Sequence, residues 1–231
     1  MDMTEKEEVR TERKEIVSAI ETLINEARVV NFSDAVFAFA ATLLVLKIDL
    51  GGIVPTQIQS SFWTILVNMW PVYLANIVSF LVISYYWLSH HAVFGLMKRL
   101  DPMIVWLNIV FLISIAFLPF PVDLFGDYST VPEVVLFYTG SLAVVGYFLA
   151  VMWWYASSHH RLIDKDLSER HVRFYTIQNL IAPVVFTLSM PLVYIDPWVT
   201  QVTWIFVVIG IAILNKFYKY KKMTELEKIV V

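Results

Sequence analysis

The sequence of 231 residues contains no cysteine, only seven glycines and few charged residues. The absence of cysteine excludes disulfides, thiol catalysis and thiolate metal sites. Charged residues make up 16% of the chain, whereas 58% are apolar and 15% aromatic. Soluble domains are closer to about 45–50% apolar. The composition is therefore that of an integral membrane protein, and we expect the lipid bilayer, and no nucleic acid, among its partners.

Six long apolar segments predict an all-α membrane protein with six transmembrane helices, because a spanning helix needs about 20 mostly apolar residues. No similarity between two halves is visible, so we expect a single repeat. Residues 1–28 are predicted to form a cytoplasmic amphipathic segment, 29–217 the six-span domain and 218–231 a basic cytoplasmic tail. The predicted spans are about 29–48, 71–97, 102–121, 132–157, 172–194 and 198–217.

Several boundaries have recognisable stop signals. The first span should end at Lys47, Asp49 and the pair Gly51-Gly52. Residues 57–70 then read as a short amphipathic helix with Trp63 and Trp70 at a membrane interface. The third span should close on the segment Leu118-Pro119-Phe120-Pro121, and Pro183 and Pro191 are expected to kink the fifth.

The basic residues predict the orientation. With six spans, 16 of the 17 Lys and Arg residues fall on one side, and only Lys47 falls on the other. By the positive-inside rule, both termini are predicted to be cytoplasmic. The opposite side carries mainly acidic residues. Those residues either gather cations at an outer mouth or simply reflect the sorting of the positive charges. The acidic residues are Asp49, Asp123, Asp127, Glu133 and Asp196.

The first span carries an ionisable residue, Asp34, about one turn inside. A carboxylate at that depth costs about 2–3 kcal/mol, so it normally faces protein or water and has a partner. At about 100° per residue, two stripes emerge on this helix. The first, which we expect to face the same subunit, is Asp34, Ala38, Ala41 and Val45. The second, about 140° away with Thr42 between the two, is Phe39, Leu43 and Leu46.

This geometry favours Asp34 as a structural brace over Asp34 as an ion ligand. Partners for Asp34 and for Arg28 are expected at the same depth, at the end of the second span. An indole or imidazole N–H donates a hydrogen bond to a carboxylate. Ser89 is a further candidate in the same segment. The donors concerned are Trp87, His90 and His91.

Other chemistries fit less well. The pairs His90-His91 and His159-His160 lack a third histidine one turn away, and no Glu-x-x-His motif occurs, so we expect no metal site and no cofactor. Intramembrane hydrolysis would need a second buried carboxylate or a Ser paired with a base. We therefore expect no enzyme. An ion-coupled secondary transporter that titrates Asp34 stays open as the alternative.

The first half of the chain carries a series of motifs. The first has Arg28, then Phe32-Ser33-Asp34-Ala35-Val36-Phe37-Ala38, then Thr42-Leu43-Leu44. The series continues in Tyr86-Trp87-Leu88-Ser89-His90-His91 with Phe94, in Trp106-Leu107-Asn108 and in Ala116-Phe117-Leu118-Pro119-Phe120-Pro121. In order and spacing, these motifs resemble the transmembrane-protein-175 family, potassium channels of endosomes and lysosomes with bacterial homologues.

The resemblance implies a homotetramer in a bacterial inner (plasma) membrane, with a central pore lined by the first span of each subunit. By position, the family's pore constriction maps onto Phe39, Leu43 and Leu46, and its span-one threonine onto Thr42. The family usually has Ile or Leu where this chain has Phe39. The implied structural network comprises Arg28, Phe32, Ser33, Asp34, Trp87, His90 and His91. Since no carbonyl filter motif occurs, we expect a potassium-preferring cation channel with a hydrophobic gate.

Overall fold

The computed structural model describes residues 10, 13, 26–46 and 55–230, and the side chains of residues 10, 13, 26–46 and 62–219. Most of the amphipathic segment predicted for residues 1–28 lies outside the described residues. So do the predicted stop signal at Lys47, Asp49, Gly51 and Gly52 and most side chains of the basic tail.

Helices account for nearly all the regular structure in this part of the chain. They are α2 (Glu26–Leu46), α3 (Pro55–Asn68), α4 (Trp70–Gly95), α5 (Pro102–Phe117), α6 (Pro119–Tyr128), α7 (Pro132–Ser157), η1 (Ser158–His160), α8 (Glu169–Ser189), η2 (Met190–Tyr194), α9 (Pro197–Thr203) and α10 (Ile205–Val230). Six stretches are long and apolar enough to cross a membrane, which confirms the predicted fold class. The stretches are Glu26–Leu46, Trp70–Gly95, Pro102–Tyr128, Pro132–His160, Glu169–Tyr194 and Pro197–Lys219.

The third span is longer than the sequence suggested. Helix α5 ends at Phe117, but α6 begins at Pro119 and carries the span on to Tyr128. Proline lacks an amide hydrogen, yet the first turn of a helix does not need one. Pro119 and Pro121 therefore start α6 where we expected them to end the span. The backbone N–H of Val122 donates to the carbonyl of Leu118 across the joint.

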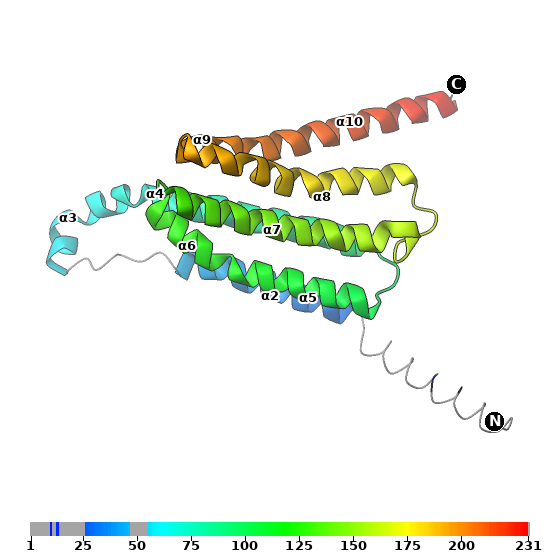
Figure 1. Cartoon of the computed structure of the whole chain (residues 1–231), viewed down its shortest axis with the longest axis horizontal. Helices are drawn as coiled ribbons and strands as arrows, with labels where there is room; N and C mark the ends of the chain where they lie inside the picture. Colours follow the sequence, from blue (N-terminus) through cyan, green and yellow to red (C-terminus); the bar gives the residue numbers. More distant parts are fainter. Residues whose placement is uncertain (1–9, 11–12, 14–25, 47–54, 231) are drawn as a thin grey trace.

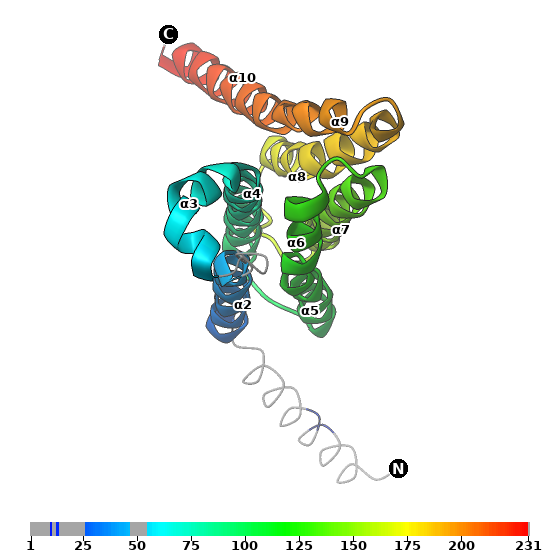
Figure 2. The same cartoon turned by 90° about the vertical axis from the view of Figure 1, so that its left-hand side faces the viewer.

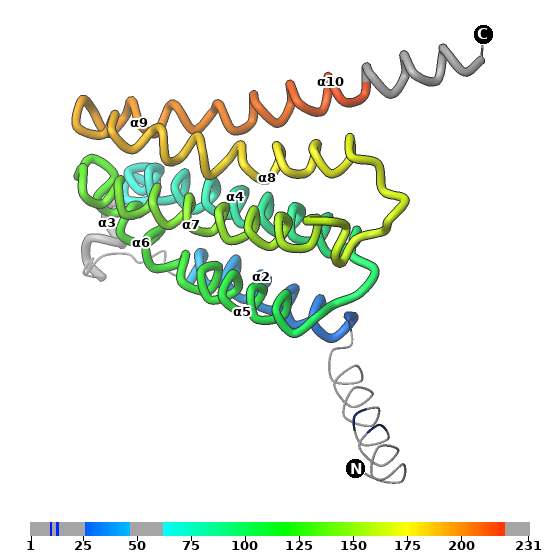
Figure 3. The backbone as a smooth tube through the Cα atoms, turned by 45° about the vertical axis from the view of Figure 1, so that its right-hand side comes forward, coloured from blue at the N-terminus to red at the C-terminus, as the bar shows by residue number. Residues whose placement is uncertain are grey.

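The spanning helices run side by side along the long axis of the molecule (Figure 1). Seen end on, α2 lies beside α4 and α5 at one side, and α9 and α10 lie at the opposite side beyond α8 (Figure 2). Helix α7 packs against α5, α6 and α8 and contributes many of the buried side chains. Helix α10 lies along α8 at the edge of the bundle (Figure 3).

Close packing at Gly146 joins α7 to α8. A Cβ added at Gly146 would lie 2.8 Å from the Pro183 ring. Helix α8 continues through Pro183 as far as Ser189, and the chain then tightens into η2 around Pro191. The proline ring therefore fills the space that the glycine leaves, as small residues allow between helices in a membrane.

Hydrogen bonds join the connecting segments at one end of the bundle. Arg99 donates from Nε and Nη2 to the carbonyl of Arg161, at 3.0 and 2.7 Å. Asp101 accepts from the Ile104 N–H at the start of α5 and from the Tyr155 hydroxyl. Figure 1 shows the start of α2 and the α4–α5 and α7–α8 connections at this end. The basic residues of these segments therefore gather on one side, as the sequence predicted.

Candidate functional site

Helix α2 is covered on one face only. Its buried residues are Ser33, Phe37, Ala40 and Leu44, which recur every three or four positions and pack against α4 and α5. The stripe that we expected to face the subunit was Asp34, Ala38, Ala41 and Val45. That expectation was wrong, because Ala38 and Val45 are exposed and only Asp34 and Ala41 are half-buried.

The physical reason lies in the membrane setting. Every face of this helix is apolar, so hydropathy alone does not distinguish a face that touches protein from one that does not. We used Asp34 to orient the helix, on the assumption that a carboxylate turns to the centre of the contact. In the structure it sits at the edge of the covered face, where one donor from the neighbouring helix reaches it.

That donor is Trp87. Its indole Nε1 donates to Asp34 Oδ1 at 2.8 Å, a pairing anticipated from the sequence. The Trp87 ring is itself flanked by His91, with ring centroids 6.0 Å apart, and His91 is exposed. The other two motif residues, Arg28 and Phe32, are also exposed, and Ser89 is buried. The structure therefore joins Asp34 to Trp87, but it leaves Arg28 and Phe32 outside this contact.

A second set of polar groups is buried between α2, α4 and α5. His90 Nε2 lies 2.8 Å from Asn108 Oδ1, and Asn108 Nδ2 donates to Ser33 Oγ at 2.9 Å. Ser33 in turn donates to the carbonyl of Val29, one turn earlier in α2, at 2.9 Å. An amide oxygen is only an acceptor, so His90 donates from Nε2 and the chain of three hydrogen bonds runs in one direction.

Aromatic rings surround His90. It stacks on Phe94, with centroids 4.4 Å apart, and on Phe111, with centroids 5.4 Å apart and planes 4° apart. Phe37 of α2 lies against it at 5.7 Å. Since unmet hydrogen bonds are most costly in such an apolar setting, the histidine, amide and hydroxyl specify one arrangement of the three helices.

Asn108 is the residue whose role we did not identify from the sequence. It was part of a matching motif, but we assigned it no function. The available signal was its position, since it is a side-chain amide in the otherwise apolar span of α5, where an unpaired amide would be costly.

The uncovered face of α2 carries most of the predicted constriction. Phe39 is 62% exposed and Leu46 is 78% exposed, whereas Leu43 is half-buried at the edge of the covered face. Thr42 is exposed, and its hydroxyl donates to the carbonyl of Phe39 at 2.9 Å. Phe39, Thr42 and Leu46 are therefore available to a partner, whereas Leu43 is partly occupied within the subunit.

The arrangement has the features of a scaffold that holds one helix in a fixed orientation. Within the described residues, no group of three or more His, Asp or Glu side chains is placed to hold a metal ion. Asp34 and Ser33 of α2 are bonded to α4 and α5 on one side, and a largely apolar surface is left free on the other.

Comparison with known proteins places these features in a family. The model described as endosomal/lysosomal potassium channel TMEM175 matches residues 28–119. A potassium channel of Chamaesiphon minutus is 32% identical over 182 residues, which are 75% of this chain and 86% of that protein. The mouse endosomal/lysosomal proton channel TMEM175 is 25% identical over 73% of this chain and 36% of its own length.

A solved structure has the same fold. The crystal structure of a lysosomal potassium-selective channel TMEM175 homolog from Chamaesiphon minutus superposes with a TM-score of 0.70 at 26% identity. The superposition covers 81% of this chain and 96% of that one. The family match includes α2, α4 and α5, the three helices joined by the polar contacts described above.

Proposed function

This chain belongs to the endosomal/lysosomal potassium channel family TMEM175, and we propose that it is a potassium channel that conducts ions passively through a pore lined by α2. The observation that carries the pore assignment is the one-sided packing of α2. Its Ser33, Phe37, Ala40 and Leu44 face is buried, while Phe39 and Leu46 are exposed. Such a surface fits a helix that meets copies of itself around an axis.

This geometry supports oligomerisation. One bundle with one pore-type helix does not enclose an ion path, so several subunits must contribute α2. We propose a homotetramer, as the family resemblance implies, with α2 of each subunit at the symmetry axis.

The constriction that we propose consists of Phe39 and Leu46, with Leu43 at its edge and the Thr42 hydroxyl between them. No carbonyl filter motif exists in the sequence, so selection would depend on dehydration at a narrow apolar ring. Potassium loses its hydration shell more easily than sodium does, which favours potassium modestly. An apolar ring also closes by expelling water.

In this proposal, the polar contacts act as braces. The Trp87–Asp34 bond and the His90–Asn108–Ser33 chain set the rotation of α2, and hence which side chains face the axis. The channel forms no covalent bonds and needs no cofactor, with potassium and other monovalent cations as its permeant partners.

The orientation and location are also proposals. Basic residues gather at the end that holds the start of α2 and the α7–α8 connection, which supports cytoplasmic termini by the positive-inside rule. The bacterial relative supports a bacterial plasma membrane.

Flux through reconstituted vesicles tests the function. Purified protein in liposomes is expected to release potassium down its gradient faster than sodium, with caesium and protons measured in parallel and protein-free vesicles as the blank. Potassium movement that requires a proton gradient would contradict passive conduction. An Asp34→Asn variant separates the alternatives further: a channel should lose oligomer yield, whereas a transporter that titrates Asp34 would stay assembled and lose only coupling.

A further inference from the structure

A cavity in the described part of the chain is lined by α4 and by later helices, and none of its lining residues belongs to α2. It has a volume of about 880 Å³ and lies between α4 on one side and α9 and α10 on the other. Leu142 of α7 and Ala182 and Phe186 of α8 are buried at its base. We propose that this cavity binds one acyl chain of a membrane phospholipid.

The walls of the cavity are apolar along most of its length. Val78 and Val82 of α4 and Val207, Val208 and Ile211 of α10 line it. Because these residues belong to two spanning segments, the gap between the segments lies at the depth of the bilayer hydrocarbon. The cavity volume falls within the usual range for small-molecule sites, about 300–1,000 Å³.

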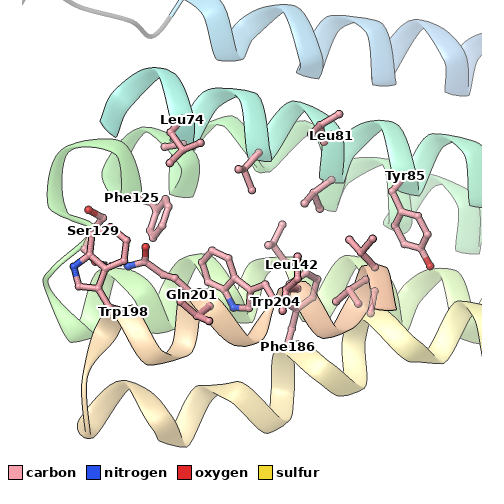
Figure 4. Close-up of a pocket in the computed structure, with 18 of the residues that line it drawn as sticks. Leu74, Leu81, Tyr85, Phe125, Ser129, Leu142, Phe186, Trp198, Gln201 and Trp204 are labelled. Atoms are coloured by element: carbon pink, nitrogen blue, oxygen red, sulfur yellow. Dashed lines mark hydrogen bonds between the residues drawn. The ribbon is translucent and has the colours of Figure 1, made fainter. Parts of the chain in front are cut away.

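Polar groups are concentrated at one end. Ser129, Thr130 and Gln201 line the cavity next to Trp198, and Figure 4 shows Ser129 and Trp198 at the end opposite Tyr85. Gln201 Nε2 donates to the carbonyl of Ser129 at 2.8 Å. The hydroxyls of Ser129 and Thr130 line the same end, and a hydroxyl is a donor that the carbonyl of a lipid ester accepts. Exposed tryptophans at this same end, such as Trp63, Trp70 and Trp198, mark a membrane interface.

The cavity is long enough to hold one lipid tail. The lining of α4 runs from Trp70 to Tyr85, which corresponds to about 22 Å of helix. One leaflet contributes about 15 Å of hydrocarbon. A lipid with its ester region beside Ser129 and Gln201 would therefore extend one tail past Val78 toward Tyr85.

The weak attachment of the sixth span explains why the space is free. Helix α10 packs on α8, and few of its side chains are buried. A lipid tail in the cavity would supply the missing contact between α10 and α4. The Tyr85 hydroxyl at the opposite end donates to the carbonyl of Gln178. A second copy of this chain would offer a rigid helix in place of the tail, without a reason for the hydroxyl and amide groups gathered beside Ser129.

Photo-crosslinking tests the proposal without reference to ion flux. The full chain is reconstituted with a phosphatidylglycerol that carries a diazirine near the middle of one acyl chain, or with one that carries it in the headgroup. The tail probe is expected to label residues 78–85 and 205–211 more strongly than Trp106 and Ile113, which are exposed and do not line the cavity. The headgroup probe should label residues 129–130 and 198–201.

Variants of α4 provide the control. Val78→Trp fills the cavity and should lower labelling by the tail probe there by roughly tenfold, equivalent to about 1.4 kcal/mol. Ile77→Trp, on an exposed neighbour that does not line the cavity, should leave the labelling unchanged. If Val78→Trp does not elute like the parent protein, Leu81→Trp replaces it. The proposal would be overturned if the tail probe labelled the cavity and the other exposed residues equally, or if the two variants had equal effects. It would also be overturned if the cavity residues stayed unlabelled because a second copy of the chain fills the site.

Discussion

The indole of Trp87 holds Asp34 across two helices, with Nε1 2.8 Å from Oδ1. Asp34 stands at the edge of the covered face of α2, between buried Ser33 and exposed Ala35. A bond at this edge resists rotation of α2 more directly than one at the centre of the contact, because any rotation breaks it. The direction in which Phe39 points is therefore linked to a contact on a different helix.

Replacing Trp87 by Phe tests this link. The variant keeps an aromatic ring but removes the donor to the carboxylate, and hydrogen bonds to charged groups contribute about 1.5–3 kcal/mol. Because Trp87 is partly exposed, we expect the lower end of that range. The measurement is the temperature at which the oligomer dissociates on gel filtration. Trp154→Phe, at an exposed tryptophan with no such bond, is the matched control and should not shift it.

Asn108 is expected to be a strong determinant of stability. Asn108→Leu has a similar volume but removes both bonds of the amide, which leaves the buried N–H of His90 without its acceptor. An unsatisfied buried donor costs about 1–3 kcal/mol. Thermal unfolding in detergent should show this loss. The control Asn215→Leu changes an exposed amide on α10 and should be neutral; equal stability of the two variants would refute the role of Asn108.

Much of the fold could be predicted from the sequence because the membrane imposes simple rules. Span length and basic residues depend on the chain alone, so the six helices and the shared basic end were predicted. The Asp34–Trp87 pair was also anticipated, since a carboxylate in that place needs a donor. The rotation of α2 about its axis was not predicted, because the faces of a helix that meet lipid, protein or pore are all apolar. Asp34 did not indicate the rotation either, since it lies at the edge of the covered face.

The role of Asn108 in joining three helices was not predicted, for a related reason. A single amide in an apolar span signals that a partner exists, but it does not identify the partner. The partners come from α2 and α4, and only the packing of three helices brings Ser33 and His90 to it. The proline pair at the start of α6 shows the same limit, because Pro119 and Pro121 can begin a helix as well as end one.

A polar substitution at Phe39 is expected to hydrate the proposed constriction. Phe39→Asn should raise potassium efflux from liposomes by about tenfold, as expected if the barrier falls by about 1.4 kcal/mol, because a polar ring keeps water in the constriction. Phe39→Leu keeps an apolar side chain at this position and should stay selective. Unchanged efflux with Phe39→Asn would remove this residue from the pore.

The hydroxyl of Thr42 is predicted to affect selectivity more than stability. Its bond to the Phe39 carbonyl lies within one exposed turn, so Thr42→Val should change stability by less than about 0.5 kcal/mol. If the hydroxyl faces the ion path, the ratio of potassium to sodium flux should fall. A ratio equal to that of the unmodified protein would place Thr42 outside the path.

Gly146→Ala is predicted to destabilise the subunit. The new methyl group would lie 2.8 Å from Pro183, and overpacking of this kind costs about 1–3 kcal/mol. Gly95→Ala is the matched control in α4, because nothing lies within 4 Å of its added Cβ. The difference between the two unfolding temperatures isolates the helix contact from the general effect of replacing glycine. If Gly146→Ala unfolded at a temperature no lower than that of Gly95→Ala, α7 and α8 would be able to move apart without a loss of stability.

The peripheral place of α10 has a consequence for biosynthesis. Among the described helices, α4, α5 and α6 pack most closely on α2, and all three leave the ribosome before α8 is complete. The rotation of the first helix can therefore be set while the chain is still growing, and the last span joins a bundle whose inner surface already exists. Sequence drift in α10 would then alter the lipid-facing boundary of the protein while leaving its inner lining untouched.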